Sequence, residues 1–196
     1  MYERRRRPKT QHYFVRHAQP LNRNHDDAGR ELSAKGLEDR KLVTAFLLDK
    51  GIDAVLSSPY ARAADTVRHF ADTVRMPIIH MPDFREREVA GEWIDDFDSF
   101  CRQQWADFDY HLPGGECLRE VQARNIAGVQ RVLKEYAGQK VVIGSHGTSI
   151  ATVLNHFDPS FGFEGFESIR RLMPWIVRLD FEGETFLGME KFNIME

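Results

Sequence analysis

The run KVVIGSHG at residues 140–147 constrains the fold more than any other stretch of the sequence. Its two valines and its isoleucine form a continuous apolar segment, which is typical of a strand buried on both faces at the centre of a parallel sheet. Helices cover both faces of such a sheet, so the rest of the chain is expected to alternate between strand and helix.

Strand and helix patterns do alternate along the chain. Short apolar runs predict strands at residues 13–15, 53–58 and 77–79. Helical spacing predicts helices over residues 34–50, 61–73, 116–133 and 149–157, the first capped by Ser33 and ended by Gly51. Residues 158–174 are expected to form a loop, and residues 175–192 a hairpin that turns at 182–184. The pattern indicates an α/β fold with a mostly parallel sheet.

The length of 196 residues allows one sizeable core, so we expect one domain over residues 12–196 and a flexible basic tail over residues 1–11 that contains the run Arg4–Arg7. A formal net charge of -3 argues against a dedicated nucleic-acid binder. The N-terminus lacks the apolar segment of a signal peptide, and no apolar stretch is long enough to predict a membrane span. Two cysteines favour a reducing, cytoplasmic setting.

Polar clusters follow three of the expected strands. Arg16-His17 follows the first, the segment 57–59 with Arg62 follows the second, and His146 follows the strand at residues 140–145. Ligands of open α/β sheets bind outside the carboxyl ends of the strands. We therefore expect two histidines and two arginines, distant in sequence, to meet at one edge of the sheet.

These side chains suit a phosphoryl group. The guanidinium of arginine matches phosphate oxygens with a planar fork of donors. A histidine can attack phosphorus through one ring nitrogen if a hydrogen bond to the other nitrogen fixes the tautomer. The remaining histidines show no metal-ligand spacing, and neither His-Glu-x-x-His nor paired Cys-x-x-Cys occurs. We expect neither a metal nor a cofactor.

Five blocks occur in the order VRHAQP, SSPYARAADT, FRERE..GEW, PGGECL and VVIGSHG. Together they resemble the histidine phosphatase superfamily, also called the phosphoglycerate-mutase-like family, over residues 13–186. The resemblance implies a three-layer α/β/α sandwich, a phosphohistidine intermediate and no metal. It implies that His17 is the nucleophile, that Arg16 and Arg62 bind phosphate, and that His146 is the second histidine of the pocket.

The resemblance also implies a general acid, which falls within FREREVAGEW. Glu86 matches that position best, and Glu88 is its rival. Two departures from the family pattern stand out. Ala18 replaces the glycine that usually follows the nucleophile, and the asparagine often found further on is replaced by Arg23, between Asn22 and Asn24. Which of residues 22–24 completes the phosphate pocket stays open.

The first expectation for function is a metal-independent phosphatase that hydrolyses a small phosphate monoester through phosphohistidine on His17. A phosphoglycerate mutase on the same fold is one alternative. A phospho-ligand binding protein with weakened catalysis is another. The physiological substrate and the oligomeric state, a dimer included, stay open.

Overall fold

The computed structural model describes residues 8–91 and 94–195. These residues form a six-stranded sheet in the order β3-β2-β4-β1-β5-β6. The strands are β1 (Lys9–Arg16), β2 (Ala54–Ser57), β3 (Ile78–His80), β4 (Lys140–Ser145), β5 (Trp175–Glu182) and β6 (Thr185–Phe192). Strands β1 to β4 pair in parallel, whereas β5 and β6 join as an antiparallel hairpin. The predicted α/β fold with a mostly parallel sheet is confirmed.

The register of the sheet aligns the carboxyl ends of its central strands. Arg16 at the end of β1 stands opposite Ser145 at the end of β4, and Ser57 at the end of β2 stands opposite Gly144. The pairing continues past the strand ends, because the amide of His17 donates to the carbonyl of Ser145 at 3.1 Å. The three polar clusters predicted from the sequence therefore lie side by side at the carboxyl edge of the sheet.

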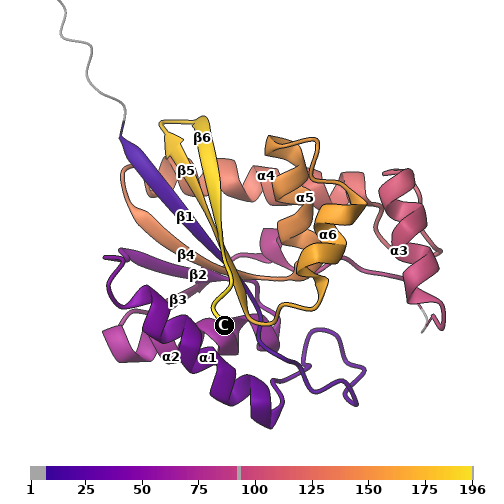
Figure 1. The fold of residues 1–196 in the computed structure, drawn as a ribbon, viewed down its shortest axis with the longest axis horizontal. Coiled ribbons are helices and arrows are strands. Elements are labelled where there is room, and N and C mark those ends of the chain that lie inside the picture. The colour runs from indigo at the N-terminus through magenta and orange to yellow at the C-terminus, as the bar shows by residue number, and fades with distance from the viewer. Residues whose placement is uncertain (1–7, 92–93, 196) are drawn as a thin grey trace, which may run out of the picture.

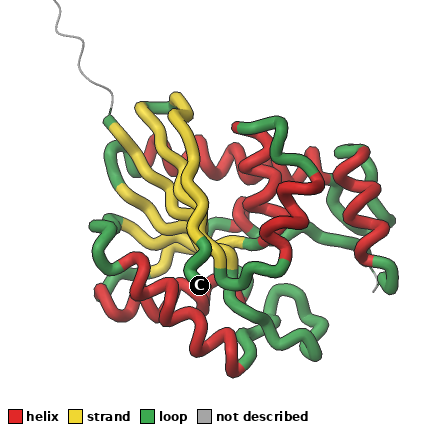
Figure 2. Tube along the Cα trace, viewed as in Figure 1, coloured by secondary structure: helices red, strands yellow, loops and turns green. Residues whose placement is uncertain are grey.

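Helices cover both faces of the sheet (Figures 1 and 2). Helices α1 (Ala34–Leu47) and α2 (Ala61–Val74) pack on one face, where Tyr13 and Val15 of β1 meet them. Helices α4 (Leu118–Glu135), α5 (Gly147–Phe157) and α6 (Phe163–Arg170) pack on the other face against Phe14. Successive side chains of β1 thus point into two hydrophobic cores, one on each face of the sheet, and the fold is a three-layer sandwich.

Several boundaries differ from the expectations. Strand β1 begins at Lys9, so residues 9–11, which the sequence assigned to the tail, belong to the sheet. The segment 158–174, expected as a loop, contains α6, a short helix that buries Phe166 and Ile169. The segment between β3 and α4 holds a 3₁₀ turn, η1 (Pro82–Phe84), and α3 (Phe97–Ala106). The Arg4–Arg7 run and Trp93 lie outside the described residues.

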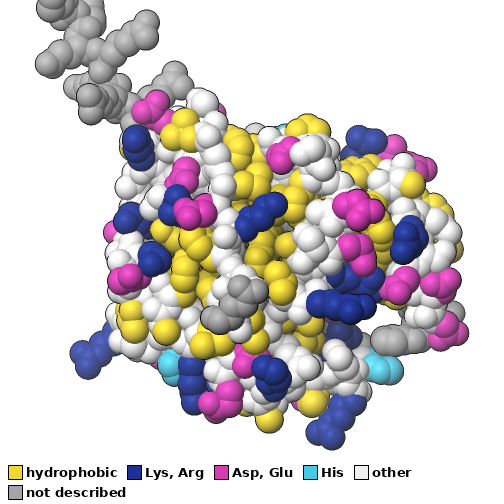
Figure 3. Space-filling model, viewed as in Figure 1, with side chains coloured by type: hydrophobic (Ala, Val, Ile, Leu, Met, Phe, Trp, Pro, Cys, Tyr) yellow, Lys and Arg dark blue, Asp and Glu magenta, His cyan; other side chains and the backbone are white. Residues whose placement is uncertain are grey.

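Charges of both signs are interspersed over the face seen in Figure 3, where Lys and Arg side chains neighbour Asp and Glu. Salt bridges of the helix surface follow this pattern, for example Lys35 with Asp39 at 2.5 Å. None of the helices that the structure describes combines the length and the hydropathy needed to cross a bilayer.

Candidate active site

His17 lies directly after β1 and is 6% exposed. Its Nδ1 is 2.8 Å from the carbonyl oxygen of Ala18. A carbonyl only accepts hydrogen bonds, so Nδ1 carries the proton and Nε2 keeps its lone pair. Burial first, and then the guanidinium groups of Arg62 and Arg16, hold the pKa of His17 well below its usual value. The imidazole is therefore neutral, with one nitrogen available as a nucleophile.

Arg16 is buried beside His17, and its guanidinium is fixed from two directions. Its Nη1 donates to the carbonyl of Ile169 at 2.5 Å and, more weakly, to that of Leu172 at 3.4 Å. On the other side, a Cβ added to Gly147 would come within 3.1 Å of three guanidinium atoms. Glycine at the start of α5 thus lets the arginine lie against the backbone. Burial lowers the pKa of Arg16 to about 10, so the side chain stays charged at neutral pH.

His146 follows β4 and is fully buried at the position before α5. Its ring centroid is 5.3 Å from that of His17, and its Nε2 is 2.8 Å from the hydroxyl oxygen of Ser58. Its Nδ1 is buried without a hydrogen-bond partner among the described residues. Burial, followed by the charge of Arg62, lowers the pKa of His146 well below its usual value. The two predicted histidines are therefore brought together, and both are neutral.

Arg62, in the first turn of α2, is 3% exposed. Its Nη2 is 3.1 Å from Oδ1 of Asp27, and its Nη1 donates to the backbone carbonyl of the same residue. Arg30 approaches the same carboxylate at 3.6 Å. Burial lowers the pKa of Arg62, an effect that Asp27 and Glu86 oppose. The structure therefore adds Arg30 and Asp27 to the residues that the sequence singled out.

The two candidate acids differ in their surroundings. Glu86 accepts a hydrogen bond from the amide of Thr148 at 3.2 Å, in the first turn of α5, where the positive end of the helix dipole favours a carboxylate. Its charge also acts on both Arg16 and Arg62. Glu88 is exposed, and its backbone amide is held by Glu116 at 3.0 Å. Of the two candidate acids, Glu86 is therefore the one that interacts with Arg16 and Arg62, the arginines next to the two histidines.

A largely buried ion pair, whose two side chains are 14% and 15% exposed, holds the segment that carries Glu86. Arg124 of α4 forms a two-pronged pair with Glu116, with both distances 2.9 Å. The same guanidinium donates to the carbonyls of Asp83, Arg85 and Glu86 at 2.8–3.2 Å. Burial acts to raise the pKa of Glu116, but Arg124, the amide of Glu88 and Arg85 together hold that pKa below its usual value. The Glu116 of PGGECL thus positions the acid-bearing segment.

A cavity of about 550 Å³ opens beside these groups. Its polar lining includes His17, Arg30, Arg62, Glu86, Glu88 and Thr148. Arg16 and His146 lie buried next to these lining residues. The other side is more apolar, with residues 89–91, Ile94 and Phe97 at the start of α3. The arginines around His17 form the basic end of the cavity, which Asp27, Glu86 and Glu88 also line, and the remaining lining is more apolar.

The residues expected to complete the basic end do not reach the cavity. Asn22 and Arg23 are exposed, and the side-chain amide of Asn24 donates to Glu31 at 2.7 Å. Arg30 lines the cavity in their place. A bridge between Pro20 and Leu32 closes the loop at its base and returns Arg30 toward His17. Periodicity carries no signal for such a loop, which is why sequence reasoning missed Arg30.

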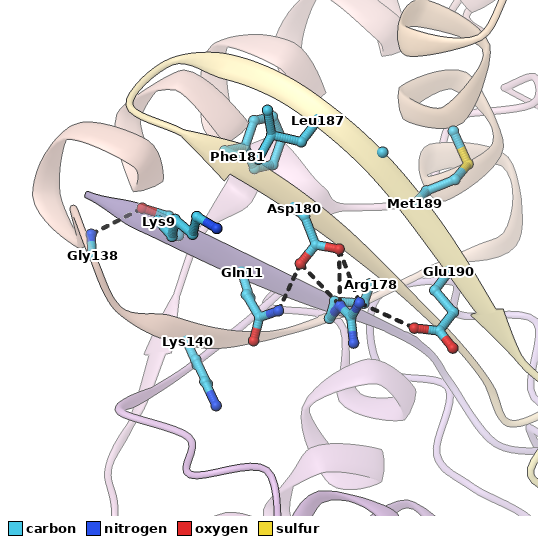
Figure 4. A pocket seen from close by; sticks show the side chains of 12 residues that line it. Lys9, Gln11, Gly138, Lys140, Arg178, Asp180, Phe181, Leu187, Met189 and Glu190 are labelled. Carbon is cyan, nitrogen blue, oxygen red and sulfur yellow. Dashed lines mark hydrogen bonds and ion pairs between the residues drawn. The ribbon is translucent and has the colours of Figure 1, made fainter. Parts of the chain in front are cut away.

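A larger hollow of about 750 Å³ lies at the opposite end of the sheet, beneath the β5–β6 hairpin (Figure 4). Asp180 accepts from Gln11 at 2.6 Å and pairs with Arg178 at 3.0 Å, and Arg178 also pairs with Glu190. None of the predicted site residues lines this hollow. We place the chemistry in the smaller cavity because His17, whose pKa is lowered, lines it. Within the described part of the chain, no group of three or more His, Cys, Asp or Glu side chains is arranged to hold a metal ion.

The fold and the site define an α/β protein with two buried neutral histidines at the carboxyl edge of its sheet, surrounded by arginines. The family model of the histidine phosphatase superfamily (branch 1) matches residues 12–192, and the chain belongs to this superfamily. The resemblance seen in the sequence is thereby confirmed.

Two curated relatives illustrate the range of the family. An uncharacterized phosphatase of Bacillus subtilis (strain 168), PhoE, is 26% identical over 163 residues, which cover 83% of this chain and 81% of that protein. A probable phosphoglycerate mutase of Yersinia pestis (strain Pestoides F), GpmB, is 26% identical over 155 residues, covering 73% and 72% of the two chains.

Solved structures share the fold. A mycobacterial glucosyl-3-phosphoglycerate phosphatase superposes with a TM-score of 0.73 at 20% identity, covering 94% of this chain and 99% of that one. A phosphoglycerate mutase of Bacillus anthracis (strain Sterne) superposes with a TM-score of 0.72 at 15% identity, covering 95% and 94%. At these identities the comparison bears on the fold alone.

Proposed function

We propose that this protein hydrolyses a small phosphate monoester through a phosphohistidine intermediate on His17, without a metal or other cofactor. The observation that carries the proposal is the hydrogen bond from Nδ1 of His17 to the carbonyl of Ala18. It leaves Nε2 unprotonated at the basic end of the cavity, where an electrophilic phosphorus would be attacked. The two free, buried cysteines support a reducing, cytoplasmic setting as part of the same proposal.

The first step transfers the phosphoryl group to the enzyme. Nε2 of His17 attacks phosphorus, a new P–N bond forms, and the P–O bond to the leaving group breaks. Arg16, Arg62 and Arg30 neutralise the phosphoryl oxygens. Glu86 gives its proton to the leaving alkoxide, which departs as an alcohol. The position of Glu86 at the cavity supports this role.

The second step returns the enzyme to its starting state. Water attacks the phosphorus of phosphohistidine while Glu86 takes a proton from it, the P–N bond breaks, and inorganic phosphate forms. Nε2 regains its lone pair, and the proton taken from water replaces the one that Glu86 gave to the alkoxide. His146, adjacent to His17, acts on the phosphoryl oxygens as charge develops.

The nucleophile is tested with His17→Ala. We expect loss of p-nitrophenyl phosphate hydrolysis and loss of an acid-labile phosphoenzyme. His111→Ala is the matched control, because His111 is an exposed histidine outside the cavity and its removal is expected to leave both signals intact. Unchanged turnover in His17→Ala contradicts the proposal.

The acid is tested by the leaving group. Alkyl phosphates need protonation of a poor leaving group, whereas p-nitrophenolate leaves without much help. Glu86→Gln is expected to lower turnover of alkyl phosphates by about 10²–10⁴-fold and that of p-nitrophenyl phosphate far less. Glu88→Gln is the control. The opposite ranking of the two variants assigns the acid to Glu88.

The curated relative named as a probable phosphoglycerate mutase supports a second candidate function. A mutase would return the phosphoryl group from His17 to a second position of the bound product before water attacks. Isomerisation of phosphoglycerate that depends on 2,3-bisphosphoglycerate would identify it. A phospho-ligand binding protein with weakened catalysis, the third alternative, is disfavoured by the placement of Glu86 at the cavity.

A further inference from the structure

The carboxylate of Asp27 sits on the guanidinium groups that we propose for phosphate. Its Oδ1 is 3.1 Å from Nη2 of Arg62 and 3.6 Å from Nη1 of Arg30. Among the described residues it is the acid that forms an ion pair with Arg62. Asp27 also lines the cavity that contains His17. An anionic group of the protein thus lies where a phosphoryl oxygen would have to be bound.

A counter-ion at Arg62 stabilises the free site, where Glu86 is the other nearby carboxylate. Arg16 and Arg62 are both nearly buried, and Arg30 is close to Arg62, so like charges repel one another when no anion is bound. The same positive charges lower the pKa of His17, after burial, and Arg30 acts on Arg62 in the same sense. The carboxylate of Asp27 offsets this repulsion in the free protein.

The backbone at Asp27 is fixed, but its side chain can leave. The carbonyl of Asp27 accepts from Nη1 of Arg62, and the carbonyl of Ala28 accepts from the amide of Ala61 at 2.9 Å. These bonds hold the loop on the start of α2. The side chain of Asp27, in contrast, is 45% exposed and can rotate into water without breaking them. Displacement of the carboxylate therefore needs no movement of the loop.

We propose that Asp27 is an internal competitor of the substrate: it occupies the guanidinium groups of Arg62 and Arg30 in the free protein, and a bound phosphoryl group displaces it. Asp27 then sets the affinity of the site for phosphate. The inference rests on the proposed function, because it assumes that these arginines bind the phosphoryl oxygens. It adds a residue that determines affinity through competition and leaves the chemical step unchanged.

The test measures binding of inorganic phosphate by isothermal titration calorimetry at fixed pH and ionic strength. Asp27→Asn keeps the size of the side chain and removes its charge. We expect the Kd for phosphate to fall by about two- to fivefold, the range for loss of a partly exposed ion pair that competes with the anion. Asp27→Ala serves as a second variant with the same expectation, and a thermal melt verifies that each variant is folded.

Asp26→Asn is the matched control. Asp26 is the neighbouring acid of the same loop, and its carboxylate accepts from the amide of Gly29 at 3.1 Å, a bond that asparagine can keep. Its replacement is expected to change the Kd by less than about twofold, because an exposed charge away from the arginines is screened. An equal effect of both substitutions would overturn the inference in favour of a general effect of loop charge.

A Kd that is unchanged or higher in Asp27→Asn also overturns the inference, since it would mean that Asp27 orients Arg62 for phosphate. The titration does not require turnover, so it is independent of the test of the proposed function. Tighter phosphate binding in the variant, combined with no hydrolysis by the wild type, would keep the inference and reject the phosphatase activity. Absence of phosphate binding in the wild type and in both Asp27 variants rejects the inference.

Discussion

Replacement of Arg124 by methionine probes the ion pair on which the acid-bearing segment depends. The guanidinium of Arg124 is 14% exposed and meets the carboxylate of Glu116, which is 15% exposed, with two parallel bonds of 2.9 Å. It also satisfies the carbonyls of Asp83, Arg85 and Glu86. Methionine retains the apolar stem and removes the charge, so the substitution isolates these polar contacts.

Removal of one partner from a buried pair costs about 3–5 kcal/mol, because the other charge remains without compensation. Glu116 keeps bonds to Arg85 at 2.8 Å and to the amide of Glu88 at 3.0 Å, which places the expected loss at about 3 kcal/mol, near the lower end of that range. For a domain of this length, this loss corresponds to a fall in Tm of about 6–12 °C.

Arg119→Met is the matched control. Arg119 belongs to the same helix and also forms a two-pronged pair, with Asp109 at 2.5 and 3.0 Å, but both side chains are more than 60% exposed. An exposed pair contributes little to stability, because water solvates both charges and salt screens them. Thermal unfolding followed by circular dichroism compares the two variants. Equal melting temperatures for Arg124→Met and Arg119→Met would refute the argument from burial.

The pH dependence of unfolding gives a second measurement of the same pair. The pKa of Glu116 is below its usual value in the folded protein, so its stabilising contribution is present above the pKa of the unfolded chain and is lost as the pH falls. The stability difference between the wild type and Arg124→Met should therefore narrow on acidification. Addition of Glu116→Gln to Arg124→Met should recover part of the loss at neutral pH, because it removes a charge that has lost one of its two arginine partners.

Two further substitutions test other parts of the structure. Both ring nitrogens of His12 are buried without a partner among the described residues, so His12→Leu should raise the free energy of unfolding by about 1–3 kcal/mol at pH 7. Burial lowers the pKa of His12 to about 3, so the gain in stability should increase by about 1.4 kcal/mol per pH unit as the pH falls below 6.5. Denaturant titrations at several pH values would measure this slope. A gain that does not depend on pH would contradict the lowered pKa of His12. Gly147→Ala brings a methyl group to 3.1 Å from the guanidinium of Arg16 and should weaken phosphate binding, measured by calorimetry, while the protein stays folded. Unchanged phosphate affinity in Gly147→Ala would show that Arg16 does not bind phosphate.

The sequence predicts the part of the site whose residues directly follow the ends of strands. Arg16, His17 and His146 follow apolar runs, and parallel strands in register bring their ends together whatever the loops do. Arg62 is predicted for the same reason, because only a short link separates the end of β2 from the start of α2. Local patterning suffices for these residues because the sheet determines their positions.

Other parts of the site depend on long-range contacts and escape local patterning. Arg30 and Asp27 lie on a loop whose path follows from the bridge at its base and from bonds to α2. The choice between Glu86 and Glu88 depends on α5, more than sixty residues further along the chain, whose first turn holds one carboxylate. Helix α6 was missed because eight residues containing two phenylalanines and a glycine carry too short a periodic signal.

The electrostatics of the free site explain how two adjacent histidines can have different roles, one as a nucleophile and the other as a hydrogen-bond donor. Burial and the nearby arginines keep His17 and His146 neutral, so the nucleophile needs no base to remove a proton. A phosphoryl group brings negative charge to the same arginines and reverses their effect on both imidazoles. The buried Nδ1 of His146 has no hydrogen-bond partner among the described residues, whereas Nε2 is 2.8 Å from the hydroxyl oxygen of Ser58. On the proposed function, the substrate itself therefore favours the positively charged form of His146, in which both ring nitrogens are donors.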